Sequence, residues 1–220
     1  MNELSQIYQT RFEATGLEKR DRVWKVLCGA FFQKLIPAGS TVFDLACGYG
    51  EFINNIEAAK KYGADLNPDS PARLNRDVEF HLVPATEIAR IAPGQVDVVF
   101  TSNFLEHLKS KNECNAVMAE VLRLLRPGGK FIIMGPNIRY AFAEYWDYYD
   151  HYLPLSHLSL AEGLQINGYE VEKVIPRFLP YTMNNSTPTH PILVRGYLAV
   201  PLAWRFMGRQ FLVVARKPGK

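Results

Sequence analysis

The chain has 220 residues, of which 25 are Lys or Arg and 22 are Asp or Glu, so its formal net charge is +3. Hydrophobic residues make up 48% and charged residues 21% of the chain. These proportions exclude a disordered or fibrous chain. The length fits one α/β domain with a small elaboration. No long Lys/Arg run occurs, so the mild positive charge does not indicate a nucleic-acid partner.

The chain has three cysteines, at positions 28, 47 and 114. Their number is odd, no C-x-x-C spacing occurs, and no group of neighbouring histidines accompanies them. We therefore expect neither a disulfide framework nor a bound metal.

No stretch of the sequence is typical of a secretory signal or a membrane span. Residues 1–22 contain no apolar core segment, and the apolar stretch 192–207 is interrupted by Arg195, Pro201 and Arg205. The sequence thus predicts a cytoplasmic protein.

The first 36 residues are expected to form a helical cover. Apolar positions recur at helical spacing after Asp21, a plausible N-cap, and residues 37–39 (Pro-Ala-Gly) end the segment. The more polar residues 1–20 would form a further helix or a lid.

Short β-rich runs alternate with helical patterns from residue 41 onward. Predicted strands cover 41–45, 61–66, 78–83, 96–101 and 130–134, and predicted helices cover 51–60 and 112–125. This alternation predicts a doubly wound α/β fold, in which helices cover both faces of a mostly parallel sheet. Ligands of such sheets bind beyond the carboxyl ends of the strands.

The composition changes after residue 135. Seven aromatic residues fall within residues 140–152. A helix is predicted at 156–167, a strand at 169–175, a loop at 176–191, an apolar helix broken by Pro201 at 196–207, and a strand at 210–216. We interpret residues 136–208 as an acceptor-side elaboration of a single domain that spans residues 1–220.

A glycine-containing turn follows the first predicted strand. Gly48 and Gly50 let the backbone bend sharply and approach a ligand, and the carboxylates of Asp44 and Glu51 flank them. Two carboxylates repel a pyrophosphate but suit a ligand that carries an ammonium or a sulfonium. The turn lacks the Lys-Ser/Thr of a Walker A loop and the G-x-G-x-x-G of a dinucleotide site.

Four segments, in order and at normal spacing, resemble motifs of the class I S-adenosylmethionine (SAM)-dependent methyltransferases. They are residues 42–52 (motif I), 62–68 (the end of strand two), 97–108 (strand four and its turn) and 122–131 (the turn before strand five). The resemblance, to small-molecule enzymes of the UbiE type, implies a seven-stranded sheet of order 3-2-1-4-5-7-6 with strand 7 antiparallel. It also implies SAM as cofactor and S-adenosylhomocysteine as product.

The same resemblance implies which residues contact SAM. They are Asp44, Ala46, Cys47, Gly48 and Gly50 in the first turn, Asp65 and Leu66 at the ribose, Ala85 and Thr86 at the adenine, and Ser102, Asn103 and Phe104 after strand four. Ala46 replaces the usual first glycine, which is tolerable at a negative φ. Where the family often has an adenine-binding Asp this chain has Pro84, which has no N–H to donate.

Several residues are candidates for deprotonating an acceptor. The pair Asp150-His151 is the first choice, His157 is the second, and His107 is a further candidate base. A buried structural pair is the alternative for Asp150-His151. Cys47 is interpreted as a packing residue rather than a nucleophile.

The expected activity is methyl transfer from SAM to a small-molecule hydroxyl, of a sugar or glycolipid or of a phenol such as a quinone precursor. Residues 101–104 (Thr-Ser-Asn-Phe) lack the Asn/Asp-Pro-Pro-Tyr/Phe tetrapeptide of enzymes that methylate amino groups of bases or glutamine. Residues 136–140, 145–147 and 210–216 are similar to bacterial methyltransferases found among glycan-building enzymes. An RNA or protein methyltransferase and a non-catalytic SAM-fold interaction protein are the alternatives. We expect no nucleic-acid partner and a monomer or homodimer.

Overall fold

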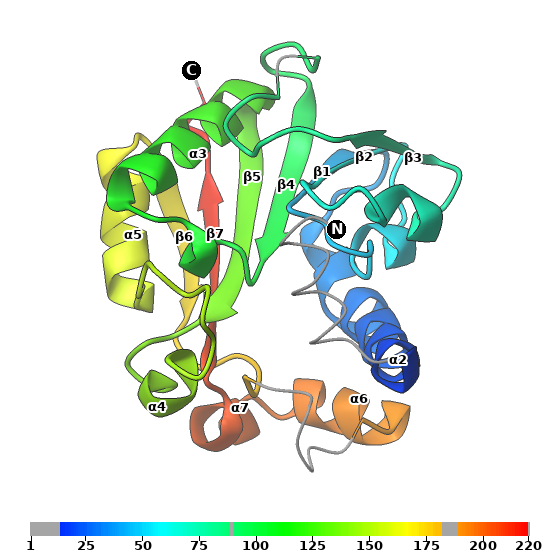
Figure 1. Cartoon of the computed structure of the whole chain (residues 1–220), viewed down its shortest axis with the longest axis vertical. Helices are drawn as coiled ribbons and strands as arrows, with labels where there is room; N and C mark the ends of the chain where they lie inside the picture. Colours follow the sequence, from blue (N-terminus) through cyan, green and yellow to red (C-terminus); the bar gives the residue numbers. More distant parts are fainter. Residues whose placement is uncertain (1–13, 89, 182–188, 220) are drawn as a thin grey trace. The chain divides into compact units, whose positions relative to one another are not determined.

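The computed structural model describes residues 14–88, 90–181 and 189–219. Their strands form a seven-stranded sheet of order β3-β2-β1-β4-β5-β7-β6 (Figure 1). This is the strand order that the sequence predicts. The chain divides into two compact units. Among the described residues, unit 1 consists of residues 14–84 and 189–201. Unit 2 consists of residues 85–181, except residue 89, and of residues 202–219.

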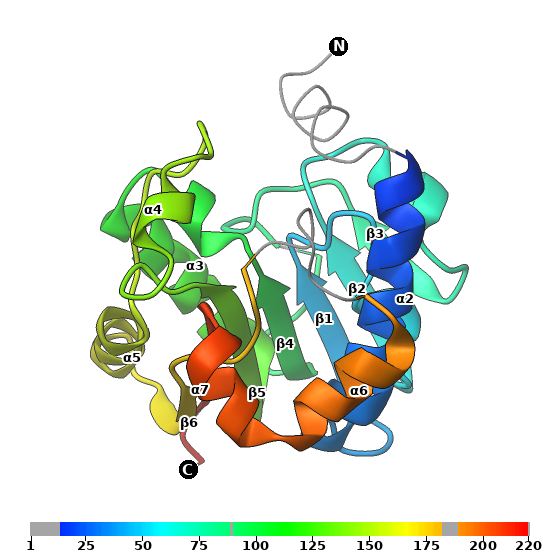
Figure 2. The same ribbon diagram turned by 90° about the horizontal axis from the view of Figure 1, so that it is seen from below.

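Unit 1 contains three parallel strands. Its strands and helices are α2 (Ala14–Ala30), β1 (Thr41–Leu45), β2 (Lys60–Ala64), β3 (Val78–His81) and α6 (Pro191–Ala199), with 3₁₀ turns at Phe32–Leu35, Ile53–Asn55 and Ser70–Arg73. β2 pairs with both β1 and β3 in parallel, and Asp44 of β1 lies opposite Gly63 of β2. Helices α2 and α6 pack against each other, as Figure 2 shows.

Two predictions in unit 1 are wrong. Asp21 does not cap a helix, because α2 already begins at Ala14 and runs through Asp21. The helix predicted at 51–60 is only the 3₁₀ turn Ile53–Asn55. Asn54 explains this difference: its side chain donates to the carbonyl of Arg73 at 2.9 Å and accepts from the amide of Asn75 at 2.8 Å, which holds the segment to a distant loop.

Unit 2 contains the other four strands. Its elements are β4 (Val96–Ser102), α3 (Lys111–Leu124), β5 (Leu125–Pro136), α4 (Phe142–Tyr145), α5 (His157–Ile166), β6 (Glu170–Ile175), α7 (Pro201–Met207) and β7 (Gln210–Arg216), with a 3₁₀ turn at Leu105–His107. The Ser110 side chain caps α3 at the Glu113 amide, and Ser156 and Ser159 form a capping box on α5.

β7 lies between β5 and β6 and is antiparallel to both. Its register with β5 runs from Lys130 opposite Arg216 to Pro136 opposite Gln210. The predicted strand at 210–216 and its antiparallel direction are therefore confirmed.

The predicted break at Pro201 is also confirmed, but it separates two helices, because α6 begins at Pro191 rather than at Gly196. None of the helices in the described ranges is long and apolar enough to cross a membrane. The expectations for residues 1–13 and for the loop segment 182–188 lie outside the described residues.

Candidate functional site

The turn after β1 has an unusual backbone. Ala46, Gly48 and Gly50 all have positive φ, of 56°, 54° and 80°. A Cβ on Gly50 would lie 2.4 Å from Cδ2 of Leu74 and would displace the end of that side chain, and the positive φ of Gly50 itself favours glycine. The expectation of a negative φ at Ala46 is wrong, and the left-handed conformation costs an L-residue roughly 1–2 kcal/mol.

Asp65, just beyond β2, is tied to this turn. Its Oδ2 accepts a hydrogen bond from the Gly48 amide at 2.7 Å, and its Oδ1 accepts one from the Asn67 amide at 2.8 Å. Burial raises the pKa of Asp65, although the amide hydrogen bonds oppose the shift. Each carboxylate oxygen has a second lone pair, so the side chain can also accept from a ligand hydroxyl.

Three carboxylates gather at the turn. Burial raises the pKa of Asp44 well above its ordinary value, and the charges of Glu51 and Asp65 raise it further. Glu51 also forms an ion pair with Arg20 of α2, at 2.8 Å. Because the charges of Glu51 and Asp65 disfavour the charged form of Asp44, this group favours a nearby cation.

The two neighbours of this acidic group differ in exposure. Cys47 is buried, and burial raises its thiol pKa, as do the charges of Asp44 and Asp65. This favours a packing role for Cys47 over a nucleophilic one. Leu66 follows Asp65 and is 53% exposed, which leaves an apolar side chain beside the carboxylate.

The other residues expected to contact SAM belong to unit 2. Ala85 is half-buried and Thr86 is exposed, in the turn that follows Pro84. After β4, Ser102 and Phe104 are half-buried and Asn103 is exposed. Asn103 has a positive φ of 49°, and its amide donates to the carbonyl of Met134 at 2.9 Å.

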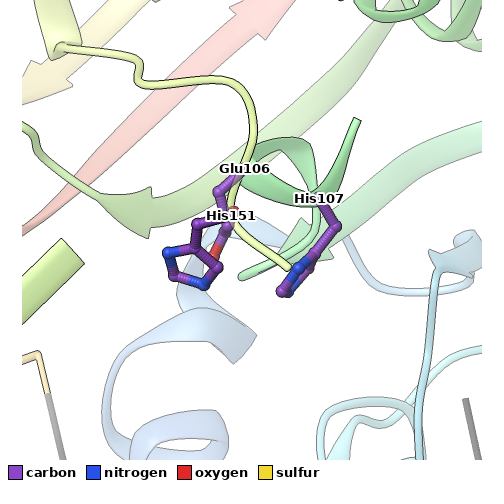
Figure 3. A group of neighbouring side chains, drawn as sticks. All are labelled: Glu106, His107 and His151. Atoms are coloured by element: carbon purple, nitrogen blue, oxygen red, sulfur yellow. The ribbon is translucent and has the colours of Figure 1, made fainter. Parts of the chain in front are cut away.

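Unit 2 contains a second group of titratable side chains, drawn in Figure 3. Glu106 and His107 come from the 3₁₀ turn after β4, and His151 comes from the loop after α4. One potential ligand atom of each lies within 4.8 Å of the others, so this group could hold a metal ion. The amides of Tyr152 and Leu153 donate to the Glu106 carbonyl at 2.8 and 3.1 Å, which fastens the loop to the turn.

Asp150, expected to act with His151, forms an ion pair with His107. Nδ1 of His107 lies 3.2 Å from Oδ2 of Asp150 and 3.0 Å from its carbonyl oxygen. Burial lowers the pKa of His107, but the hydrogen bond to Asp150 and the charges of Glu106 and Asp150 outweigh it, so the net shift is upward. His151 packs against the rings of His107, Tyr145 and Tyr148, at centroid distances of 4.9, 4.6 and 4.9 Å.

His157 has a different environment. Its Nδ1 lies 2.8 Å from Nδ2 of Asn137, an amide that also donates to the carbonyl of Pro176 at 2.8 Å. Burial and the charge of Arg139 lower the pKa of His157. A neutral, buried and hydrogen-bonded imidazole at the start of α5 favours a structural role.

Sequence reasoning missed the metal-ligand geometry of Glu106, His107 and His151. Metal ligands are recognisable in a sequence when they are closely spaced along the chain, whereas His151 comes near Glu106 and His107 only in the folded structure. It also gave no role to Tyr145, which is fully buried and whose hydroxyl has no hydrogen-bond partner among the residues that the structure describes.

Comparison with known proteins finds a family model that matches part of the chain. Residues 43–133 match the family model described as a methyltransferase domain. The tRNA (carboxymethyluridine(34)-5-O)-methyltransferase ALKBH8 of Macaca fascicularis is 28% identical over 103 residues, which are 46% of this chain and 15% of that protein. The ubiquinone biosynthesis O-methyltransferase of Thiobacillus denitrificans is 34% identical over 101 residues, 42% of each chain. The chain thus spans less than half the length of these relatives.

Solved structures share the fold. A SAM-dependent methyltransferase from Archaeoglobus fulgidus superposes with a TM-score of 0.65 at 18% identity, over 98% of this chain and 100% of that one. A chain in the solved complex of the Haloferax volcanii Trm112 methyltransferase activator superposes with a TM-score of 0.68 at 17% identity, over 91% and 92%. Residues 43–133 thus match a methyltransferase domain, and the strand order is the one expected for class I methyltransferases, whose methyl donor is SAM.

Proposed function

We propose that this chain transfers the methyl group of SAM to an oxygen atom of its acceptor. The observation that carries the proposal is the turn after β1, where Asp65 accepts a hydrogen bond from Gly48 and lies near the buried Asp44 and the half-buried Glu51. The names of the two relatives described above, a tRNA (carboxymethyluridine(34)-5-O)-methyltransferase and a ubiquinone biosynthesis O-methyltransferase, support oxygen as the methylated atom.

Unit 1 supplies the residues for the cofactor. Asp65 binds the ribose diol through the free lone pairs of its carboxylate. Asp44 and Glu51 attract the positive charge of the methionine part, and the left-handed glycines at 48 and 50 let the backbone approach it closely. Bound SAM supplies an electrophilic methyl carbon, so the protein's main task is alignment and exclusion of water.

The acceptor hydroxyl must lose its proton. In the reaction an O–C bond forms while the methyl C–S bond breaks, and the electron pair of the C–S bond stays on sulfur. We assign promotion of the proton loss to the unit 2 cluster of His107, His151, Glu106 and Asp150, because an imidazole held by a carboxylate is suited to this chemistry near neutral pH.

A small molecule is the acceptor class that we favour, bound by the aromatic segment 140–152. Its exposed side chains include Trp146, which is 51% exposed, and Tyr149, which is 93% exposed. Aromatic faces suit a phenolic or sugar ring, and the ubiquinone-related relative favours the phenol. The tRNA-modifying relative favours an RNA acceptor as the second candidate.

Two measurements test this function. First, saturating SAM at 100 times its Kd should stabilise the protein by about 2.7 kcal/mol in thermal or urea unfolding. Second, label from methyl-tritiated SAM should enter a panel of catechols and hydroxylated quinone precursors and not bulk tRNA, with a SAM-only reaction as control. Label in tRNA alone would favour RNA instead of a phenol as the acceptor. Binding of neither SAM nor S-adenosylhomocysteine would overturn the proposal.

A further inference from the structure

We propose that Glu106, His107 and His151 bind a divalent transition-metal ion, with zinc preferred, at the acceptor side of the proposed methyltransferase. The inference builds on the proposed function and specifies that this cluster promotes the proton loss through a bound ion rather than through an imidazole that acts as the base.

The donor set is the first argument. Two imidazoles and one carboxylate are the ligands of a common type of catalytic zinc site, in which a further position stays open for water or substrate. Magnesium and calcium prefer oxygen ligands, so two imidazoles select against them. One donor atom from each residue lies within 4.8 Å of the other two, which is close enough for a shared ion after small side-chain adjustments.

The second argument is the support behind His107. Its Nδ1 faces the carboxylate and the carbonyl oxygen of Asp150, at 3.2 and 3.0 Å. A hydrogen bond there fixes the tautomer with the proton on Nδ1 and leaves Nε2 as the electron-pair donor. Histidines that bind metals usually have such a carboxylate or carbonyl partner on the second ring nitrogen.

The third argument is the rigidity of the cluster. Glu106 is 4% exposed and His151 is 7% exposed, so both ligands have fixed surroundings. The amides of Tyr152 and Leu153 bind the carbonyl of Glu106 and thereby connect the two segments that supply the ligands. A carboxylate buried to this extent gains from a nearby cation.

The fourth argument is Tyr145. Its ring centroid lies 4.6 Å from that of His151, it is fully buried, and its hydroxyl has no hydrogen-bond partner within the described part of the chain. A buried hydroxyl without a partner costs stability. A water or acceptor oxygen on the ion would supply that partner.

The chemical consequence is direct. A divalent ion that binds the acceptor oxygen lowers the pKa of its hydroxyl, so the proton passes to water before the methyl group is transferred. The O–C bond then forms as the C–S bond breaks, with no change in the oxidation state of the ion.

Metal binding itself is the test. The tag-free full chain is dialysed against EDTA and then titrated with ZnCl2 in competition with a chromophoric chelator, and with CoCl2 while visible absorption is recorded. We expect one ion per chain and a cobalt spectrum typical of four- or five-coordinate nitrogen and oxygen ligands. Glu106→Gln and His151→Gln should weaken zinc binding at least 100-fold, and Asp150→Asn about 10- to 100-fold. His190→Gln, an exposed histidine in unit 1, should leave the zinc affinity unchanged.

Circular dichroism and the melting temperature of each metal-free variant separate lost ligands from lost folding. Asp150→Asn, which removes no ligand, serves as the second variant if the ligand variants unfold. Absence of stoichiometric zinc binding, or equal affinity in wild type and Glu106→Gln, would overturn the metal site and favour a buried carboxylate–imidazole cluster instead. SAM binding to the metal-free protein is measured in parallel. SAM binding without zinc binding refutes only the metal site, whereas zinc binding without SAM binding refutes only the proposed function.

Discussion

The Asp65 carboxylate accepts a hydrogen bond of 2.7 Å from the Gly48 amide, so the carboxyl end of β2 holds the turn that follows β1. One side chain therefore shapes the turn and also offers acceptor lone pairs beside it. The other oxygen of the same carboxylate accepts a hydrogen bond from the Asn67 amide, so Asp65 also holds the turn at Asn67.

Replacement of Asp65 by alanine should weaken SAM binding about 100-fold. Charged hydrogen bonds contribute about 1.5–3 kcal/mol each, and 1.4 kcal/mol corresponds to a factor of ten in affinity. Isothermal titration calorimetry measures the change. Asp69→Ala is the matched control, because Asp69 is exposed on the following turn. A loss of less than threefold for Asp65→Ala would exclude this carboxylate from the cofactor site.

Replacement of Asp44 by asparagine should stabilise the protein at neutral pH and weaken SAM binding. The folded state raises the pKa of Asp44, so it binds this proton more tightly than the unfolded chain does. The wild-type free energy of unfolding therefore falls as pH rises from about 4, the ordinary pKa of an aspartate, toward the folded-state pKa. Urea unfolding between pH 4.5 and pH 8 should show a flatter pH dependence for Asp44→Asn.

Asp77→Asn is a control for which the expected change in stability at neutral pH has the opposite sign to that of Asp44→Asn. The hydrogen bond from Lys61 lowers the pKa of the Asp77 carboxyl, so its contribution to stability is lost as pH falls below about 4. This variant should be slightly less stable than wild type at neutral pH. A steeper dependence on pH for Asp44→Asn than for wild type would contradict the buried-carboxylate explanation.

Replacement of Ala46 by glycine should stabilise the protein by about 1 kcal/mol. Ala46 has a φ of 56°, a conformation that glycine adopts without the steric cost of a Cβ. The gain is reduced by the greater backbone entropy of glycine in the unfolded chain. Ala72→Gly, at an exposed position of the 3₁₀ turn Ser70–Arg73, should instead destabilise by a few tenths to 1 kcal/mol. Equal losses of stability in both variants would show that Ala46 is unstrained.

The three thiols should be unreactive in the native protein. Cys28, Cys47 and Cys114 are all buried, and burial raises the pKa of each, to about 11 for Cys114. A disulfide reagent such as Ellman's should therefore react slowly at pH 8 and release three equivalents only in urea. One fast equivalent in the native state would identify an accessible thiolate and reopen a chemical role for Cys47.

Much of the fold can be predicted from local sequence. The strands at 41–45 and 210–216 and helix α3 follow from hydrophobic periodicity and from residues that stop elements, whereas the antiparallel direction of the strand at 210–216 is what the family resemblance implies. The segment after Gly50 could not be predicted in this way. Its conformation depends on bonds from Asn54 to Arg73 and Asn75, which a local pattern does not contain.

The candidate site likewise contains some features that local sequence predicts and others that it does not. Asp44, Gly48 and Asp65 could be found because they lie at or shortly beyond the carboxyl ends of predicted strands. The partner of Asp150 could not, because the choice between His107 and His151 depends on how the loop after α4 folds back to the turn after β4. The positive φ of Ala46 likewise results from the turn as a whole and opposes the preference of the residue itself.

The position of β7 determines when this sheet can be completed during translation. β7 is the last strand in the sequence, yet β6 joins the sheet only through it. The side chain of Lys217 then binds the carbonyls of Leu122 and Leu125 at 2.7 and 2.8 Å, at the junction of α3 and β5. Until residues 210–217 leave the ribosome, the apolar edge of β5 at Phe131–Met134 has no partner on that side, so a nascent or truncated chain exposes a surface that chaperones bind and that promotes aggregation.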